Sequence, residues 1–352
     1  CSPVKEKGHK VILTTRARIA RNLNGYKFSS LNTNDDKKSI LDTVKKSFFK
    51  NSCSEKYIFY NISRLSKIQR RFLAERHILS PEMLFNLYSK GLILKFKSED
   101  LSQSVSILIN EEDHLRIQSL MTGLNIFKTY TEALKVEKTL EKNLRFAYDK
   151  VFGYLTSCPT NIGTGLRISV IAHLPGLVLS GKIEDFIKRL LNTKFFIRGF
   201  FGENSDIVGN LFQIGNPVST GKYEKDILTE FHAVCLNIIE EELKAIELIK
   251  AEKPLVVQDS VFRAYGMLKY AKLLAYGEAL ELLSMIKLGS TIGLLKDIKP
   301  FDFYQLISLL GESNIIIACN SDIEPVNERI DIMRADIIKR EVLINDFKRN
   351  DL

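Results

Sequence analysis

A stretch in the middle of the chain places a thiol, two glycines and an arginine within twelve residues, Thr156 to Arg167. Pro159 fixes its own φ and disfavours a helical conformation at Cys158, so this thiol is expected on an extended or turning backbone. The hydroxyl of Thr160 could hydrogen-bond a thiolate two residues away. A buried cysteine beside a tight turn would give the same pattern, so this stretch alone leaves a structural and a catalytic interpretation open.

Two more arginines alternate near the start of the chain. Residues 11–13 (VIL) are apolar and partly β-branched, which predicts a strand running into the basic segment 14–22. On an extended backbone Arg16 and Arg18 project from one face and Ala17 from the other. Neighbouring guanidinium groups repel unless an anion lies between them, so a polyphosphate is an attractive ligand. A solvated basic surface is the simpler interpretation of this pair taken alone.

Three consecutive acidic residues, Glu111, Glu112 and Asp113, follow segment 104–110, whose alternating pattern predicts a strand. Carboxylates are too costly to bury without cations. On a surface turn the three would need no special explanation. Facing a cleft, they could hold a cationic substrate or act as a base, with Arg116 turned back toward the anion side.

The composition is that of a folded protein with a basic balance. Of the 352 residues, 51 are Lys or Arg and 42 are Asp or Glu, a formal charge of +9 that suits an anionic ligand or partner. No helix-turn-helix, zinc-finger spacing or aromatic recognition pattern is present, so direct nucleic-acid binding is not expected.

The cysteines and the apolar segments indicate the cellular compartment in which the protein is expected. The five cysteines are odd in number, far apart and never in a Cys-x-x-Cys pair, which predicts a reducing compartment without disulfides or a zinc site. No run approaches 18 apolar residues and no signal-peptide pattern occurs, so we expect a cytoplasmic protein without membrane association. Because the chain begins at Cys1, part of the natural N-terminus is expected to be missing.

The elements that must position these residues alternate between strands and helices up to about residue 251. Helices are expected at 35–49, 66–79, 129–150 and 224–251, and strands at 56–62, 91–97, 104–110, 194–201 and 209–217. Segment 168–179 is expected to continue from Arg167 as an apolar helix interrupted at Pro175. His77 and His173 are interpreted first as packed side chains, with a ligand role as the alternative for His77. From Ser260 onward the pattern is almost wholly helical, which predicts a second, α-helical domain.

Two sets of side chains would bind two different ligands, one anionic and one cationic. Five arginines stand on or beside a strand end or glycine turn, and a concentrated arginine cage without a Walker loop suits the phosphates of ATP bound with Mg²⁺. Carboxylates and a thiolate suit a guanidinium, which needs planar acceptors and a base. The two sets are Arg16, Arg18, Arg116, Arg167 and Arg198, and Glu112, Glu203 and Cys158.

These segments resemble the guanido (phosphagen) kinase family, and within it the bacterial protein-arginine kinases. The matching motifs are TTRAR with ARN at 14–22, NEEDHLRIQ at 110–118, TSCPTNIGTGLR at 156–167 and RGFFGE at 198–203, in the family's order. The resemblance covers about residues 11–245. It implies an α+β fold, in which residues 1–252 form a guanido-kinase catalytic domain built on a largely antiparallel sheet flanked by helices. Residues 253–352 would form a small all-α domain for dimerisation and regulation.

The resemblance also implies roles for individual residues. Glu112 would be the catalytic carboxylate, Glu203 the second carboxylate of arginine-specific members, and Cys158 the reactive cysteine beside the guanidinium. The reaction would be in-line transfer of the γ-phosphoryl group of ATP to a guanidinium nitrogen, with Mg²⁺ held mainly by phosphates and water and no protein ligand. The residues expected at the nucleotide are Thr14, Thr15, Arg16, Ala17, Arg18, His77, Arg116, Arg167, Ile168, Ser169, Val170, Ile171, Arg198, Gly199, Phe200, Phe201, Gly202 and Glu203.

The chain departs from the family in several places. The phosphoarginine-reading motif Arg-Asp-x-x-Arg-Ala is represented by residues 330–335 (IDIMRA), with an arginine displaced to Arg329. Asp331, Arg334 and Ala335 keep the spacing, and allosteric phosphoarginine binding there stays an open question. Phe201, Asn204 and Asp206 replace the usual Tyr, Gly and Glu, which we expect to alter substrate preference more than chemistry.

Three functions remain as alternatives. The first is a homodimeric protein-arginine kinase that marks proteins for degradation in a stress response, with an activator protein and an AAA+ protease as partners. The second is a kinase for free arginine or another small guanidino compound. Kinases of that kind carry a helical domain before the first arginine motif, whereas only 13 residues precede Thr14 here, so a site without that cover could admit an arginine on a polypeptide. The third is a non-catalytic adaptor, against which the intact motifs speak.

Overall fold

The structure is a computed structural model that describes residues 11–50, 56–96, 103–193, 195–200, 206–218, 220–319 and 327–344. Its centre is an eight-stranded sheet in the order β2-β3-β4-β5-β1-β8-β10-β9, and every pairing in it is antiparallel. The strands are β1 (Ile12–Arg21), β2 (Ile58–Asn61), β3 (Gly91–Phe96), β4 (Ser104–Ile109), β5 (Leu115–Thr122), β8 (Leu166–His173), β9 (Phe196–Gly199) and β10 (Leu211–Gly215). A separate hairpin joins β6 (Tyr148–Asp149) to β7 (Gly153–Tyr154).

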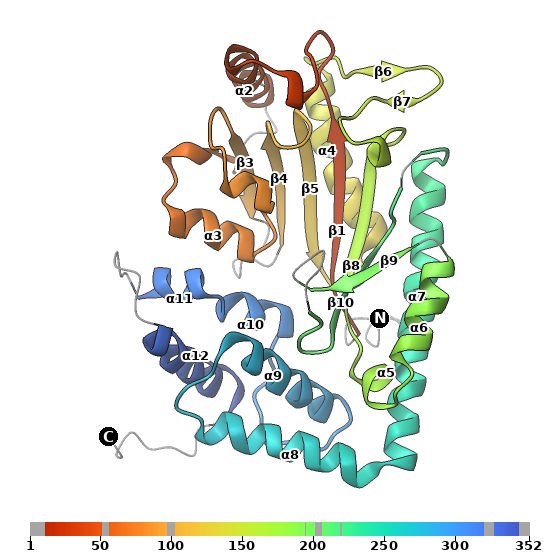
Figure 1. The fold of residues 1–352 in the computed structure, drawn as a ribbon, viewed down its shortest axis with the longest axis vertical. Coiled ribbons are helices and arrows are strands. Elements are labelled where there is room, and N and C mark those ends of the chain that lie inside the picture. The colour runs from red at the N-terminus through yellow and green to blue at the C-terminus, as the bar shows by residue number, and fades with distance from the viewer. Residues whose placement is uncertain are drawn as a thin grey trace.

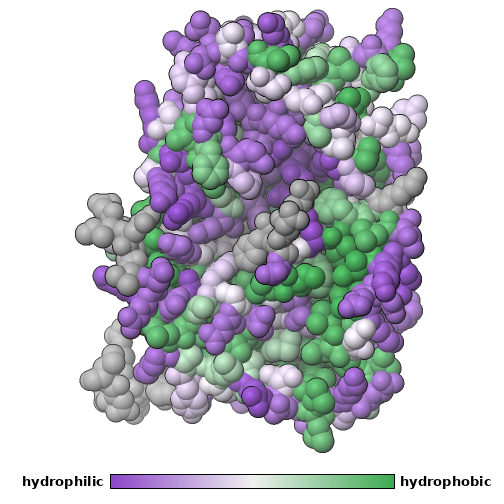
Figure 2. Space-filling view, in the orientation of Figure 1, coloured by the Kyte–Doolittle hydropathy of each residue, from purple (hydrophilic) through white to green (hydrophobic). Residues whose placement is uncertain are grey.

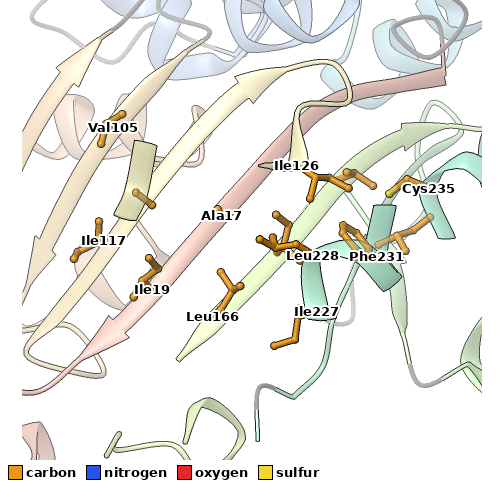
Figure 3. Close-up of a cluster of buried hydrophobic side chains, with 14 of the residues drawn as sticks. Ala17, Ile19, Val105, Ile117, Ile126, Leu166, Ile227, Leu228, Phe231 and Cys235 are labelled. Carbon is orange, nitrogen blue, oxygen red and sulfur yellow. The ribbon is translucent and has the colours of Figure 1, made fainter. Parts of the chain in front are cut away.

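One face of the sheet is covered by helices α2 (Asn34–Phe49), α4 (Ile126–Glu141) and α7 (Glu224–Glu252). Ala17 and Ile19 of β1 belong to the buried cluster on this side of the sheet, which also includes Phe231 of α7 (Figure 3). The alternation of β1 therefore sends Ala17 and Ile19 into the main core and leaves Arg16 and Arg18 on the other face.

Two groups of helices, which touch each other where α3 meets α11, cover the opposite face. α3 (Lys67–Glu75) and the residues after it pack on β3 and β4. The helices α8 (Pro254–Tyr270), α9 (Tyr276–Thr291), α10 (Phe303–Leu309), α11 (Glu312–Ala318) and α12 (Asn327–Val342) lie together at one end of the sheet (Figure 1). They share a buried cluster with sheet residues that include Leu13, Leu120 and Ile171.

The helical region and the sheet are thus packed together. The long helix α7 runs from beside the sheet toward the last five helices (Figure 1), and Lys253 is the one residue between α7 and α8. Short helices α5 (Pro175–Leu179) and α6 (Ile183–Asn192) lie next to α7. The division into domains 1–252 and 253–352 stays a prediction, because the two parts contribute side chains to a common core.

The predicted helix at 168–179 is wrong. Residues Leu166–His173 form β8, a central strand between β1 and β10. Leu166, Ile168 and Val170 face the main core while Ile171 faces the helical region, and apolar residues on both faces hide the period of two that would have marked a strand. Pro175 starts α5 at its first position, where its missing N–H costs nothing.

Two other predicted helices end early. The helix expected at 129–150 begins at Ile126 and ends at Glu141, and the residues after it form the β6–β7 hairpin. In that hairpin the Asp149 side chain accepts the N–H groups of Val151 and Phe152, which fixes a turn. The helix expected at 66–79 ends at Glu75 because His77 adopts a positive φ of 55°. The remaining expected helices and strands are present, with ends that differ by a few residues.

Candidate active site

The arginines lie on the floor of a large cleft, on the sheet face turned away from the main core. Arg18 stands opposite Arg167 on β8 and Gln118 on β5, and Arg198 stands opposite Gln213 on β10. The cleft has a volume of about 1420 Å³. Figure 2 shows this side of the molecule as a hollow in which hydrophilic side chains gather. Its lining includes Arg16, Arg18, His77, Glu112, Arg116, Cys158, Arg167, Arg198 and Phe200.

The floor of the cleft is strongly electropositive. The pKa of Arg16 is lowered to about 10, mainly by burial and also by the neighbouring charges of Arg116 and Arg198, while Tyr304 opposes the shift. Burial, followed by repulsion from Arg16, Arg116 and Arg167, holds the pKa of Arg18 well below its ordinary value. Several guanidinium groups therefore repel one another across a confined space. A polyanion would relieve that repulsion, so this floor suits a polyphosphate.

Hydrogen bonds hold Arg167 and Arg198 in place. Arg167 donates from Nε to Asn161 Oδ1 at 2.9 Å, from Nη1 to the Asn216 carbonyl at 2.9 Å and from Nη2 to Thr160 Oγ1 at 2.7 Å. Arg198 donates from Nε to Gln213 Oε1 at 3.0 Å. Side chains fixed in this way lose little further freedom when a ligand binds.

The three acidic residues divide into two that build the site and one that faces the cleft. Glu111 is buried, lies 2.6 Å from Arg116 Nη1, and accepts hydrogen bonds from Ser80 Oγ and the Glu112 N–H. Asp113 is also buried, and its Oδ1 accepts the Asn22 amide at 2.7 Å and the Ser157 N–H at 2.6 Å. The Asp113 contact ties the acidic turn directly to the loop that carries Cys158.

Glu112 is the member of the trio that remains accessible. Its side chain is 42% exposed, and Oε2 lies 3.6 Å from Arg116 Nη2. Burial raises the pKa of Glu112, and the adjacent carboxylates Asp113 and Glu111 raise it further, against Arg116 and a hydrogen bond with Cys158. A carboxylate with a raised pKa beside a thiol is suited to accept a proton from a bound cation.

The thiol of Cys158 belongs to a short relay of side chains. Its Sγ lies 3.0 Å from Thr160 Oγ1, which in turn accepts the hydrogen bond from Arg167 Nη2. Since Thr160 accepts a hydrogen bond from Arg167, it can donate its own hydrogen to the sulfur of Cys158. Cys158 has an extended backbone, with φ −97° and ψ 124°, as expected from the proline that follows it.

Glycine gives this loop its shape. Gly165 has a φ of +64°, and a Cβ there would lie 2.6 Å from the carbonyl oxygen of Ala20. Only glycine combines that conformation with that close approach, so the loop reaches β1 directly before Arg167 enters β8.

His77 lines the cleft and has an unusual backbone conformation, with a φ of 55°. Its carbonyl accepts Gln118 Nε2 at 2.7 Å, and its ring lies edge-on to Phe200 with centroids 5.0 Å apart. Its ring Nε2 is buried, with no hydrogen-bond partner in the part of the chain that the structure describes. Burial, followed by the charges of Arg16 and Arg18, lowers the pKa of His77 to about 3, so the imidazole is neutral.

Some expected nucleotide residues do not reach the cleft with their side chains. Ala17, Ile168 and Val170 face the main core, and Thr15 donates to the Gly123 carbonyl on that same side. Thr14, Ser169 and Ile171 line a small void that also contacts Arg16 and Gln213. Gly199 ends β9. Phe201, Gly202 and Glu203 lie outside the described residues.

Several residues important to this site were not singled out in the sequence. Glu111 and Asp113 were seen only as part of an acidic run, although they hold Arg116 and the Cys158 loop. Asn22 lay within the ARN motif, and Gln118 was detectable as a polar residue two positions after Arg116 on the same strand. Gln213 lies opposite Arg198, but its own strand carries no arginine that could have marked it.

Comparisons with known proteins agree with this geometry. The family model for the ATP:guanido phosphotransferase C-terminal catalytic domain matches residues 39–245. The chain belongs to this family. A second model, for the protein-arginine kinase McsB C-terminal domain, matches residues 254–351. Protein-arginine kinases of Bacillus cereus strains G9842 and B4264 are each 34% identical over 336 residues, which cover 95% of this chain and 93% of theirs.

Solved structures share the guanido phosphotransferase fold. A duplicated taurocyamine kinase from Schistosoma mansoni with bound transition-state-analogue components has a TM-score of 0.61 at 22% identity, covering 74% of this chain and 38% of that one. A lombricine kinase has a TM-score of 0.54 at 23% identity, covering 70% and 68%. The α+β fold with a largely antiparallel sheet and a helical C-terminal region is confirmed.

The family's phosphoarginine motif lies at the edge of the same cleft. Arg334 and Tyr276 contribute to the cleft lining, and Arg334 Cζ lies 5.6 Å from the Tyr276 ring. The Arg334 side chain is 4% exposed, donates to the carbonyls of Leu310 at 3.0 Å and Leu274 at 2.6 Å, and pairs with Asp331. Ala335 is fully buried. Arg334 is therefore used to join loops of the helical region, and phosphoarginine binding at this motif stays a prediction.

Two further findings concern metals and membranes. Within the described ranges, no three His, Cys, Asp or Glu side chains are grouped so that they could hold a metal ion. No helix in those ranges has the length and apolar character needed to span a membrane.

Proposed function

We propose that this chain transfers the γ-phosphoryl group of ATP to arginine side chains of proteins. The observation that carries the proposal is a single cleft with two chemically different ends, joined by the Cys158 loop. Arginines that repel one another form one end, and an accessible carboxylate with a raised pKa lies beside a thiol at the other. The relatives that match nearly the whole chain are protein-arginine kinases, which supports a protein as the acceptor.

At the nucleotide end, the arginines bind and orient the triphosphate. Arg167 and Arg198 are held by neighbouring side chains and carbonyls, so they offer fixed donors to phosphate oxygens. Charge that develops on the transferring group and on the leaving phosphate oxygen is stabilised by donors already in place. His77, neutral and with an unpartnered buried nitrogen among the described residues, is suited to the base or ribose.

At the acceptor end, Glu112 takes a proton from the guanidinium, whose nitrogen lone pair then attacks the γ-phosphorus. The new N–P bond forms as the bond from the γ-phosphorus to the bridging oxygen breaks, and ADP leaves with that electron pair. Cys158 lies beside Glu112 and holds the cationic acceptor against the carboxylate. Glu203 would supply a second carboxylate. Alignment of the two reactants provides much of the rate enhancement.

Mg²⁺ is part of the proposal as a companion of the nucleotide. The cleft floor presents guanidinium groups, which repel a cation, so phosphate and water oxygens would hold the ion. The ion would neutralise charge on the phosphates, in addition to the arginines.

The finer cellular assignments are also proposals. We infer a homodimer formed through the helical region, since Leu255, Phe262 and Tyr270 expose large apolar side chains on α8. Action in the cytoplasm accords with the free thiols of Cys158, Cys235 and Cys319. A stress-response role with an activator protein and an AAA+ protease rests on the family resemblance alone.

The test is mass spectrometry, under non-acidic conditions, of an arginine-rich protein such as casein after incubation with the full chain and Mg-ATP. Free arginine is assayed in parallel. Acid-labile phosphate on protein arginines is the expected result. Product from free arginine alone would replace the proposal by a small-molecule guanidino kinase, and no product from either acceptor would favour the adaptor.

A further inference from the structure

A buried hydrogen-bond network joins the helical region to the end of α3, directly before His77. Asn314 of α11 accepts both Arg76 Nε at 3.2 Å and Arg76 Nη2 at 2.8 Å through its Oδ1. Its Nδ2 donates to Glu75 Oε2 at 2.8 Å, and Glu75 Oε1 accepts the Ser313 N–H at 3.0 Å. Arg76 and Asn314 are 5% and 6% exposed, so the network is shielded from water.

The residue that follows this network is under conformational constraint. His77 has a φ of 55°, a region that non-glycine residues rarely occupy and that persists only when the surroundings impose it. Within the catalytic part, Gln118 binds its carbonyl and Phe200 meets its ring. The helical region supplies a second ring, Tyr304 of α10, which is nearly parallel to the imidazole at 6.3 Å between centroids.

Asn314 is placed to fix the backbone on which His77 depends. It binds the side chains of the two residues immediately before His77, through three hydrogen bonds that cross from one part of the fold to the other. Arg76 also stacks on the Phe72 ring of α3, with Cζ 4.8 Å from its centroid, so the guanidinium links α3 rigidly to α11. Without Asn314, the end of α3 could relax and His77 could leave its positive φ.

We propose that Asn314 is a positioning residue for nucleotide binding: through Arg76 and Glu75 it holds His77 against the nucleotide end of the cleft. The inference rests on the proposed function in using ATP as the ligand. In this proposal α11 of the helical region supports nucleotide binding indirectly, since Asn314 is not among the residues that line the cleft. Among the described residues, Asn314 makes no hydrogen bond to Glu112 or Cys158, so the acceptor chemistry is expected to change little when Asn314 is replaced.

The test compares Asn314→Leu with a matched control, Ser284→Ala, in the full chain. Ser284 is a buried polar residue of α9 that also crosses between the two parts of the fold, because it bonds His173 and the Asn210 amide, each at 2.8 Å. Among the described residues, Ser284 makes no hydrogen bond to His77 or its neighbours. Both variants lose a buried interdomain contact, and only the first loses support for His77.

Binding of Mg-ATP is measured by titration calorimetry, and steady-state kinetics separates KM for ATP from KM for casein. We expect Asn314→Leu to raise the Kd and KM for ATP by about tenfold, equivalent to about 1.4 kcal/mol. Its kcat and KM for casein should stay within about twofold of wild type, as should every constant of Ser284→Ala. Equal nucleotide constants in the two variants would overturn the inference.

A second variant keeps the proposal testable if Asn314→Leu does not fold, as judged by circular dichroism. Arg76→Met removes the other partner, and its Kd for ATP should rise by a similar factor. Where both single variants fold, the double variant should be no weaker than the weaker single one, since both break one contact; additive effects would contradict the coupling. Failure of wild type to bind ATP or to phosphorylate casein would instead refute the proposed function.

Discussion

Replacing Glu112 by glutamine tests the central assignment, because the change removes a proton acceptor while keeping the shape of the side chain. A positioned general base contributes about 10²- to 10⁴-fold to rate, so kcat should fall by that range. The effect on nucleotide affinity should be small. Glu112 is 42% exposed and lies 3.6 Å from Arg116, so their ion pair is worth no more than about 1 kcal/mol, or about fivefold in Kd for ATP.

The pH profile gives an independent signature of the same group. Burial raises the pKa of Glu112 above its ordinary 4.5, so the acid limb of kcat for wild type should lie above that value. Activity rises there with pH because the base must be ionised to accept the proton. Glu112→Gln should lose this limb along with its activity.

The neighbouring Glu111 provides the matched control. Glu111→Gln removes the same charge one residue away, but the base at 112 remains, so kcat should fall less than about tenfold. The free energy of unfolding of Glu111→Gln should be lower than that of wild type by about 2 kcal/mol, because Arg116 loses a buried charged partner at 2.6 Å. Rates come from casein phosphorylation and affinities from calorimetry. A tenfold loss of ATP affinity in Glu112→Gln, or a kcat near wild type, would refute the reasoning.

Three further variants test the surrounding structure. Cys158→Ala should reduce kcat strongly without abolishing it, since the thiol lies beside Glu112 but is not the base, and normal turnover would remove it from the mechanism. Gly165→Ala should lower the free energy of unfolding by about 1–3 kcal/mol in urea, because of its positive φ and the 2.6 Å approach to Ala20; an unchanged midpoint would contradict this. Burial raises the pKa of Glu242 to about 8. The free energy of unfolding of the wild type should therefore fall as pH rises from about 4.5 to 8, by up to about 1.4 kcal/mol per pH unit. Glu242→Gln should show a smaller dependence on pH over this range.

The sequence was informative where one period dominated. Arg16 and Arg18 flank Ala17 in a strand with one apolar and one charged face, so their common orientation followed from alternation alone. β8 could not be recognised in this way. It lies in the centre of the sheet with apolar contacts on both faces, so its residues carry no alternation that distinguishes a strand from a buried helix.

The roles of Glu111, Glu112 and Asp113 depend on contacts that local sequence does not encode. Their partners Ser80, Asn22 and Ser157 are between 31 and 91 residues away along the chain. The turn sends the first and third side chains toward those partners and the second toward the cleft. Three adjacent carboxylates therefore have different roles, because burial and hydrogen bonding decide which of them can accept a proton.

The loop from Thr156 to Arg167 connects the two ends of the reaction physically. Thr160 Oγ1 contacts both the Cys158 sulfur at the acceptor end and Arg167 at the phosphate end. A phosphate bound to Arg167 would contact the same guanidinium that donates to Thr160, so the hydrogen bond between Thr160 and the sulfur is expected to change when the nucleotide binds. We therefore expect the reactivity of Cys158 toward a thiol reagent to differ between the free and the ATP-bound protein. The same dependence should vanish in Thr160→Val, which keeps the shape of the side chain but removes the shared oxygen.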